Sequence, residues 1–441
     1  MGTITAPGIG SGLDIAGIVS ALVAVERQPL NRIESNRAAA QTELSAFGRL
    51  NSALETFETA LGNLDSFSSF RIFETTTSDE LIATATASSD AAEGETDVVI
   101  TQLAQRQVLS SGAFADTTTV VGTGTLTITV GSDSFDLTID SSNNTLAGIR
   151  DAINNASDNT GITATVINAD DGSYLIFSSD DEGLANALTL TGGGTLSALS
   201  SGNLTVQEPP LDAQFTVSGF VVTSSSNTVS NVLQGVTFEL GAIGSTTITV
   251  GRDNAAVQES VQQFVDSFNA LDTTINELRA GDLEGESLLL TISSDLRNIF
   301  NTATTGLSST FSSLAEIGVA FNELGGLTLD ADDLTTALNT DFRGVSNLFA
   351  DPTQGYVTRL QALADALTQS GGLIDTREEG VNTRIGSFDT RIDQFELRLE
   401  SIEQRLVRQF AALDTLLSTL NNTSNFLTTQ LANLPTIQPR N

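Results

Sequence analysis

Acidic side chains are the main supply of chemically active groups in this sequence. Its 441 residues include 54 Asp and Glu and 19 Arg, and they include no His, Cys, Trp or Lys. The absence of His and Cys excludes Ser–His and Cys–His nucleophiles and Cys/His zinc sites. The absence of Lys excludes a Schiff base and the lysine of a P-loop. Catalysis or metal binding would therefore have to rely on carboxylates.

The sequence Asp330-Ala-Asp332-Asp333 has the spacing of the start of a calcium loop. Counted from Asp330, however, Leu334 and Thr335 occupy positions 5 and 6, where an EF-hand needs an oxygen ligand and a glycine. We expect instead a strand at 327–329, with Asp330 capping a helix that runs to about Asn339.

Two further acidic groups, 170–171 and 180–182, could pair as glycosidase acids. A sugar cleft is usually lined by aromatic side chains, and this chain has no Trp and two tyrosines, Tyr174 and Tyr356. We interpret the acids as solvated turn residues and the tyrosines as packing residues. The sequence predicts no catalytic residue, no cofactor site and no metal site, so we expect a protein that is not an enzyme.

The formal net charge is −35, and it is concentrated in the middle of the chain. Residues 1–60 are close to neutral, residues 381–441 are neutral, and the stretch between them holds nine Arg and 42 acids. Such a field does not favour binding to nucleic acid. No run of about 20 apolar residues predicts a membrane span. The first Arg is residue 27, so we expect no Sec signal, and with no Cys there are no disulfides.

The C-terminal region has a seven-residue apolar repeat that indicates a coiled coil. The a positions are Ile385, Ile392, Leu399, Leu406, Leu413, Leu420, Leu427 and Leu434. The d positions include Phe388, Phe395, Ile402 and Leu416. Arg391 and Arg398 at g positions would face Glu396 and Glu403 of a second copy in a parallel pair. An amphipathic helix packed on its own domain is the alternative interpretation.

The N-terminal region has a matching apolar line. Its members are Ile33, Ala40, Phe47, Leu54 and Leu61, and a shorter helix before Pro29 carries Ile15, Ile18, Leu22 and Val25. Between the two ends, alternating residues predict strands around 126–130, 135–139, 162–167 and 174–177, with a helix near 146–153 capped by Asn144 or Thr145. The Gly/Ser/Pro-rich stretch 191–210 predicts a domain boundary. Further strands are expected at 215–222, 229–240 and 246–250, before a helix from about 255.

Three segments carry a resemblance to a known family. Residues 8–15 with 18–22 and 26–30, and residues 226–237, are similar to signatures of the bacterial flagellar filament cap family, also called hook-associated protein 2. Residues 327–431 resemble its C-terminal region, and 124–177 resemble the insertion motif of several axial flagellar proteins.

The resemblance implies an α+β multidomain fold in which both chain ends build an antiparallel coiled-coil or helical leg, with two inserted β-rich head domains. The implied division is 1–45 with 400–441 (leg), 46–72 with 253–399 (helical domain), 73–115 with 206–252 (first β domain) and 116–205 (second). It also implies a small ring at the distal filament tip, most often a pentamer, that promotes flagellin polymerisation and prevents leakage of flagellin.

The implied partners are other copies of the chain, flagellin, the hook–filament junction proteins, the flagellar type III export apparatus and a cytoplasmic chaperone, with no nucleic acid and no membrane. The implied location is extracellular. The apolar residues of both ends are the expected oligomerisation and docking residues. An extracellular adhesin and a flagellin-like filament subunit are the alternatives. The acidic, lysine-free composition resembles that of proteins from salt-loving organisms.

Overall fold

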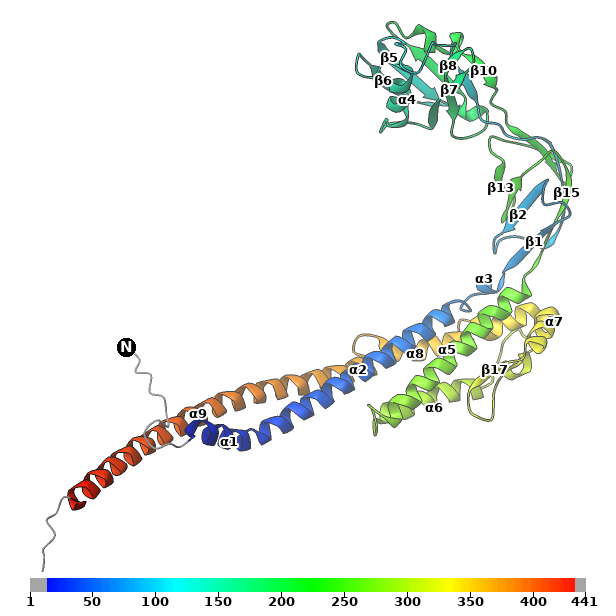
Figure 1. Ribbon diagram of the computed structural model, residues 1–441. Helices are drawn as coiled ribbons and strands as arrows, with labels where there is room; N and C mark the ends of the chain where they lie inside the picture. Colours follow the sequence, from blue (N-terminus) through cyan, green and yellow to red (C-terminus); the bar gives the residue numbers. More distant parts are fainter. Residues whose placement is uncertain (1–13, 433–441) are drawn as a thin grey trace, which may run out of the picture. The chain divides into compact units, whose positions relative to one another are not determined.

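The computed structural model describes residues 14–432, and these form two compact units. One unit, mostly helical, combines the chain up to Asp65 with the chain from Ser260 onward. The other, Ser66–Glu259, is built from small antiparallel sheets. The predicted α+β multidomain fold is confirmed, with a helical leg built from both ends of the chain and β-rich structure inserted between them (Figure 1).

The helical unit takes its elements from both ends of the sequence. Its helices are α1 (Ile15–Glu26), α2 (Gln28–Gly62), α5 (Asn254–Ala280), α6 (Ser287–Asn301), α7 (Ala331–Ala350), α8 (Tyr356–Thr368) and α9 (Leu373–Ala432). A short turn of 3-10 helix, η4 (Leu314–Ile317), and a hairpin of β16 (Val319–Phe321) and β17 (Leu327–Leu329) join α6 to α7.

Aromatic packing holds this unit together. The rings of Phe268 and Phe300 meet edge to face with centroids 5.0 Å apart, and Phe57 of α2 stacks at 6.1 Å on Phe264 of α5. Tyr356 is fully buried and donates from its hydroxyl to the Thr302 carbonyl at 3.2 Å. These contacts fasten α2 to helices that follow it by two hundred residues, which is the expected role of large apolar side chains in a core.

The 330–333 segment folds as predicted for a helix start. Asp330 follows β17 and caps α7, accepting from the backbone N–H groups of Asp332 and Asp333 at 3.1 Å. The helix continues to Ala350, past the expected end near Asn339, with non-helical dihedral angles at Asp341. The Asp341 carboxylate accepts from Thr310 and Gly344, so it pins the preceding loop at this break.

The β-rich unit contains two buried cores. The first lies between a five-stranded sheet of order β1-β15-β3-β11-β12 and a three-stranded sheet of order β13-β14-β2. A short helix, α3 (Phe67–Phe70), precedes it. The strands are β1 (Phe73–Thr77), β2 (Ala83–Ala87), β3 (Gly94–Gln102), β11 (Ala213–Val217), β12 (Phe220–Ser224), β13 (Thr228–Leu233), β14 (Val236–Leu240) and β15 (Gly244–Arg252).

The second core has the predicted strand–strand–helix–strand–strand order, divided between two sheets. These are β10-β4-β8-β7 and β6-β5-β9. The elements are β4 (Val108–Ser110), β5 (Gly124–Val130), β6 (Asp133–Ile139), α4 (Leu146–Asn154), β7 (Ile162–Ala169), β8 (Gly172–Ser179), β9 (Leu188–Gly192) and β10 (Thr205–Glu208). Three short 3-10 turns, at Leu184–Asn186, Ser197–Leu199 and Ser201–Asn203, join the later strands. Of the two expected caps, Thr145 is the one used, and it accepts from the Gly148 N–H at 3.1 Å.

Three sequence predictions in the β-rich unit need correction. The stretches 215–222 and 229–240 are hairpins, because Ser218-Gly219 and Gln234-Gly235 adopt turns that hydrophobic alternation does not reveal. The stretch 191–210 belongs largely to the second core, since Leu196 and Leu199 are fully buried.

Asp170-Asp171 is a turn between β7 and β8, as predicted. The neighbouring Tyr174 is half-buried and donates from its hydroxyl to Asp171 at 2.7 Å.

Candidate interaction site on the helical ends

Local sequence signals set the start of each helix at the ends of the chain. Asp14 accepts from the Gly17 N–H at 2.9 Å and caps α1. That helix ends at Glu26, and Pro29 lies in the first turn of α2, where a missing N–H costs nothing. The predicted short helix before Pro29 is therefore confirmed. Gly8, Gly10 and Gly12 of the family-like opening lie outside the described residues.

Helices α2 and α9 pair antiparallel within the chain. Arg37 bonds Asp389 and Glu43 bonds Arg384, so rising numbers on α2 meet falling numbers on α9 (Figure 1). These half-exposed ion pairs contribute little to stability, on the order of 0–1 kcal/mol each, but they favour one register. The seam itself is apolar: Phe47, Leu50 and Leu54 of α2 are buried.

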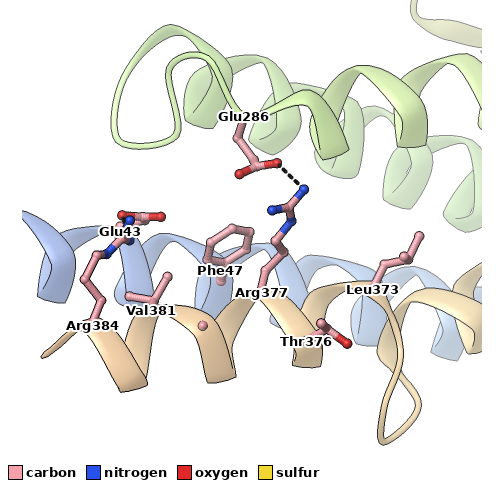
Figure 2. A pocket seen from close by; sticks show the side chains of 9 residues that line it. Glu43, Phe47, Glu286, Leu373, Thr376, Arg377, Val381 and Arg384 are labelled. Carbon is pink, nitrogen blue, oxygen red and sulfur yellow. Dashed lines mark hydrogen bonds and ion pairs between the residues drawn. The ribbon is translucent and has the colours of Figure 1, made fainter. Parts of the chain in front are cut away.

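A groove of ≈ 490 Å³ opens where α2 and α9 meet the turn before α6 (Figure 2). Its lining includes the buried rings and methyls of Phe47 and Val381, and two ion pairs lie beside them. Arg377 lies 3.5 Å from Glu286, and Arg384 bonds Glu43. Each of these two guanidinium groups therefore already has a carboxylate partner. Across residues 14–432, no group of three or more acidic side chains is placed to hold a metal ion.

Burial divides the predicted interaction residues into three groups. Five are buried within the helical unit: Ile15, Phe47, Leu54, Leu399 and Ile402. Six are half-buried on α2 and α9: Ile33, Ile385, Phe388, Ile392, Phe395 and Leu406. Six are exposed: Ile18, Leu22, Val25, Leu413, Leu420 and Leu427. Leu434, the last of the repeat, lies outside the described residues.

The three exposed leucines of α9 follow from the unequal lengths of the helices. Helix α1 packs on α9 near Glu403 and Val407, while α9 continues to Ala432. Every residue from 419 to 432 is exposed, including Leu420, Phe426 and Leu431. The heptad repeat thus continues beyond the part of α9 that the other described residues cover. An apolar stripe of this kind is typical of a surface that another protein covers.

The arginines predicted to pair with a second copy form no ion pair with the part of the chain that the structure describes. Within the described range, Arg391, Arg398 and Arg405 form no intramolecular ion pair, and the Arg398 guanidinium lies 5.8 Å from the Phe395 ring centre. The pairing that the structure does show, through Arg37 and Arg384, was missed in the sequence. The signal available in the sequence was that both helices carry arginines and acids beside their apolar repeats, as in Arg37 and Glu43 of α2 and Arg384 and Asp389 of α9.

One carboxyl on the inner face of α2 has a displaced pKa. Burial raises the pKa of Glu58, and the nearby charge of Asp365 acts in the same direction, while a hydrogen bond from Thr368 at 3.2 Å opposes them. The ionised side chain is therefore less well accommodated than the neutral one. This is the behaviour of a packing residue at a helix interface and indicates no acid–base chemistry.

None of the described helices is long and apolar enough to cross a membrane.

Comparison with known families accounts for most of the chain. Residues 11–107 match the family model described as flagellar hook-associated protein 2 N-terminus, and residues 211–422 match flagellar hook-associated protein 2 C-terminus. Residues 125–181, which span β5 to β8, match the flagellin hook IN motif. The two matched ends contain the helices of the candidate site.

Similar proteins extend the match to the full length. The A-type flagellar hook-associated protein 2 of Pseudomonas aeruginosa is 33% identical over 473 residues, covering 98% of both chains. The Escherichia coli K12 flagellar hook-associated protein 2 is 33% identical over 471 residues, covering 98% of this chain and 99% of its own. The crystal structure of the flagellar cap protein FliD D1-D2-D3 domains from Escherichia coli covers 76% of this chain and 99% of its own, with TM-score 0.65 and 35% identity. The chain belongs to the flagellar hook-associated protein 2 family.

Proposed function

We propose that this protein is the cap of a bacterial flagellar filament, acting outside the cell at the distal tip. There it would promote flagellin polymerisation and keep unpolymerised flagellin from escaping. Membership of the hook-associated protein 2 family over nearly the whole length supports this role. So does the similarity of three quarters of the chain to a solved flagellar cap protein. The family is known for structural flagellar cap proteins, which supports a structural role.

The observation that carries the proposal is the uncovered end of α9. Leu413, Leu420 and Leu427 are 41%, 56% and 54% exposed, although they continue the repeat whose earlier members are buried or half-buried. We propose that this stripe, with Ile18 and Leu22 of α1, docks on neighbouring subunits at the tip. Full burial of an exposed leucine contributes roughly 1.5–3 kcal/mol, and these half-exposed leucines would each contribute a part of that to docking.

The partners follow from that role. Copies of the chain would assemble as a small ring, for which five is the expected number, with Arg391 and Arg398 facing Glu396 and Glu403 of adjacent copies. Flagellin and the hook–filament junction proteins would contact the ring, and the type III apparatus would export the chain with the help of a chaperone. The four-part domain division is part of the same proposal.

The test is complementation of cells that lack their own cap. The variant Leu413→Asp with Leu420→Asp places charge in the exposed stripe and should leave the fold unchanged. Leu397→Asp is the matched control, because Leu397 is 68% exposed on the same helix but lies off the repeat. We expect full-length filaments with the control, and short filaments with flagellin in the medium for the double variant. Normal filaments with the double variant would rule out docking through α9.

Electron microscopy of the purified protein separates the other candidates. The match of residues 125–181 to the flagellin hook IN motif is the observation that favours a filament subunit. A cap forms small closed rings, whereas a flagellin-like subunit polymerises into long tubes. If the protein is an adhesin without a tip role, neither the parent nor any variant would restore filament growth in cap-deficient cells, but the protein would still bind surfaces.

A further inference from the structure

The free edge of β12 lacks the devices that protect most sheet edges in the β-rich unit. Exposed strand edges invite pairing with another chain, and natural proteins block them with charge, bulges, proline or covering side chains. β12 reads Phe220-Val-Val-Thr-Ser224, with no charged residue and no proline. Within the described residues, it pairs with β11 on one side and with no strand on the other.

Edge strands of the other sheets in this unit have side chains that cover their backbone groups. Ser201 and Ser200 accept from the N–H groups of Leu190 and Gly192 on β9, at 2.7 and 3.0 Å. Asn154 bonds both the N–H and the carbonyl of Ala164 on β7 at 2.8 Å. These side chains take up backbone groups that would otherwise be open to a second chain.

The remaining edges are blocked in other ways. The β6 strand carries Asp133 and Asp136, and β10 has a register shift before Glu208. The β13 strand has a bulge around Asn231, whose φ is +66°. The β1 and β2 edges pack on each other, with Thr75 donating to the Ala85 carbonyl. A bulge or a charged side chain on an edge strand disfavours pairing with a second chain, and β12 has neither.

The side chains of β12 are as open as its backbone edge. Phe220 and Val221 are 78% and 80% exposed. Val221 pairs with Thr216 on β11, and Thr216 pairs with Val99 on β3, which is 40% exposed. These three side chains share the outer face of the sheet, so an apolar row leads across three strands to the free edge.

Electrostatics favours this patch over the rest of the surface as a meeting point for two acidic chains. Residues 213–238 contain no charged residue, in a chain whose net charge is −35. Of the acids that flank this stretch on the sheet, Asp212 accepts from the Leu184 N–H at 2.8 Å, and Asp97, two strands in from the edge, accepts from the Thr247 hydroxyl at 2.8 Å. Copies that repel each other elsewhere can approach here.

The hairpin geometry makes the edge complementary to itself. Ser218 and Gly219 have φ of +49° and +85°, which closes a two-residue turn between Val217 and Phe220. Alternation of the antiparallel ladder then leaves the N–H and carbonyl groups of Val221 and Thr223 facing outward. A second β12, antiparallel and centred on Val222, would exchange backbone hydrogen bonds between Val221 of one copy and Thr223 of the other, twice.

We propose that β12 is a two-fold pairing site for a second copy of this chain, which joins two five-stranded sheets into one. The contact uses the same patch on both copies, so it differs from the head-to-tail contacts that close a ring. It therefore goes beyond the cap function and does not depend on it.

The absence of cysteine gives a direct test on the full chain. In the proposed register the two copies of Val222 face each other with Cα atoms about 4.5 Å apart, within the range of a disulfide. We expect Val222→Cys to form a disulfide-linked dimer under mild oxidation. Phe220→Cys is the register control, since its two copies would lie about 14 Å apart and should not cross-link. Equal cross-linking of both variants, or of neither, would overturn the proposal.

Hydrogen exchange gives a second readout that does not depend on oxidation. The amides of Val221 and Thr223 should become protected as protein concentration rises. Val221→Lys should abolish that protection and raise the dissociation constant of the pair by about tenfold. Leu81→Lys is the matched control, because Leu81 is 81% exposed in the same unit. Protection that is independent of concentration, or lost equally in both variants, would refute pairing through β12.

Discussion

Two phenylalanines on the paired terminal helices should respond in opposite ways to the same substitution. Phe47 of α2 is fully buried against α9, whereas Phe426 near the end of α9 is 63% exposed. If α2 and α9 form the stable core of the leg, Phe47→Ala should lower the free energy of unfolding. If the end of α9 is a docking surface, Phe426→Ala should leave stability unchanged and reduce filament growth.

The expected sizes are well separated. Replacing a buried phenylalanine by alanine costs about 3–5 kcal/mol. We expect the lower end, because the groove of ≈ 490 Å³ beside Phe47 lets water reach the vacated space. For a unit of this size, each kcal/mol moves the Tm by about 2–4 °C, so Phe47→Ala should lower the Tm by roughly 6–12 °C. An exposed substitution changes stability by about 0.5 kcal/mol or less, which is under ~2 °C.

Differential scanning calorimetry of both variants, followed by circular dichroism at 222 nm, measures these shifts in the helical unit. Complementation of cap-deficient cells then measures filament length and secreted flagellin. A Tm for Phe47→Ala within 2 °C of the parent would mean that the α2–α9 pair does not contribute to folding of the leg. A large Tm loss in Phe426→Ala would mean that α9 is already covered at its end in the free protein.

Three further outcomes follow from the charge and the packing. Raising salt from 0.1 to 1 M shortens the Debye length from about 10 to 3 Å, so the Tm of this chain of net charge −35 should rise; a flat or falling Tm would remove the halophile-like interpretation. Deleting the second β core between Gln105 and Leu211, which bridge each other, should leave the helical signal per remaining helix unchanged in circular dichroism. Because burial raises the pKa of Glu58 in the fold, its contribution to stability is complete below the unfolded pKa of about 4.3 and is lost as pH rises through the folded pKa. Glu58→Gln should therefore raise the Tm at pH 7 and have no effect near pH 3, as pH-dependent unfolding would measure.

Local signals in the sequence were sufficient for most elements. Pro29 predicted the end of α1, Asp330 predicted the start of α7, and the seven-residue repeat predicted α9. These features act within one or two turns of chain, through a missing N–H, a capping carboxylate or the 3.6-residue period, so no distant contact is needed to interpret them. The hairpin turns at Ser218-Gly219 and Gln234-Gly235 were missed, because alternation continues through both and conceals the reversal.

Only the tertiary structure decides which apolar residues of the repeats are buried within the chain and which stay exposed. Phe47 and Leu420 occupy equivalent positions in their repeats, yet one is fully buried and the other is 56% exposed. A heptad repeat specifies that a helix needs a partner, but not whether that partner belongs to the same chain or another. The antiparallel match of Arg37 with Asp389, and the unequal lengths of α2 and α9, resolve that choice for the first part of α9. The same holds for β12, because its place at the edge of the five-stranded sheet depends on strand pairing across the whole unit.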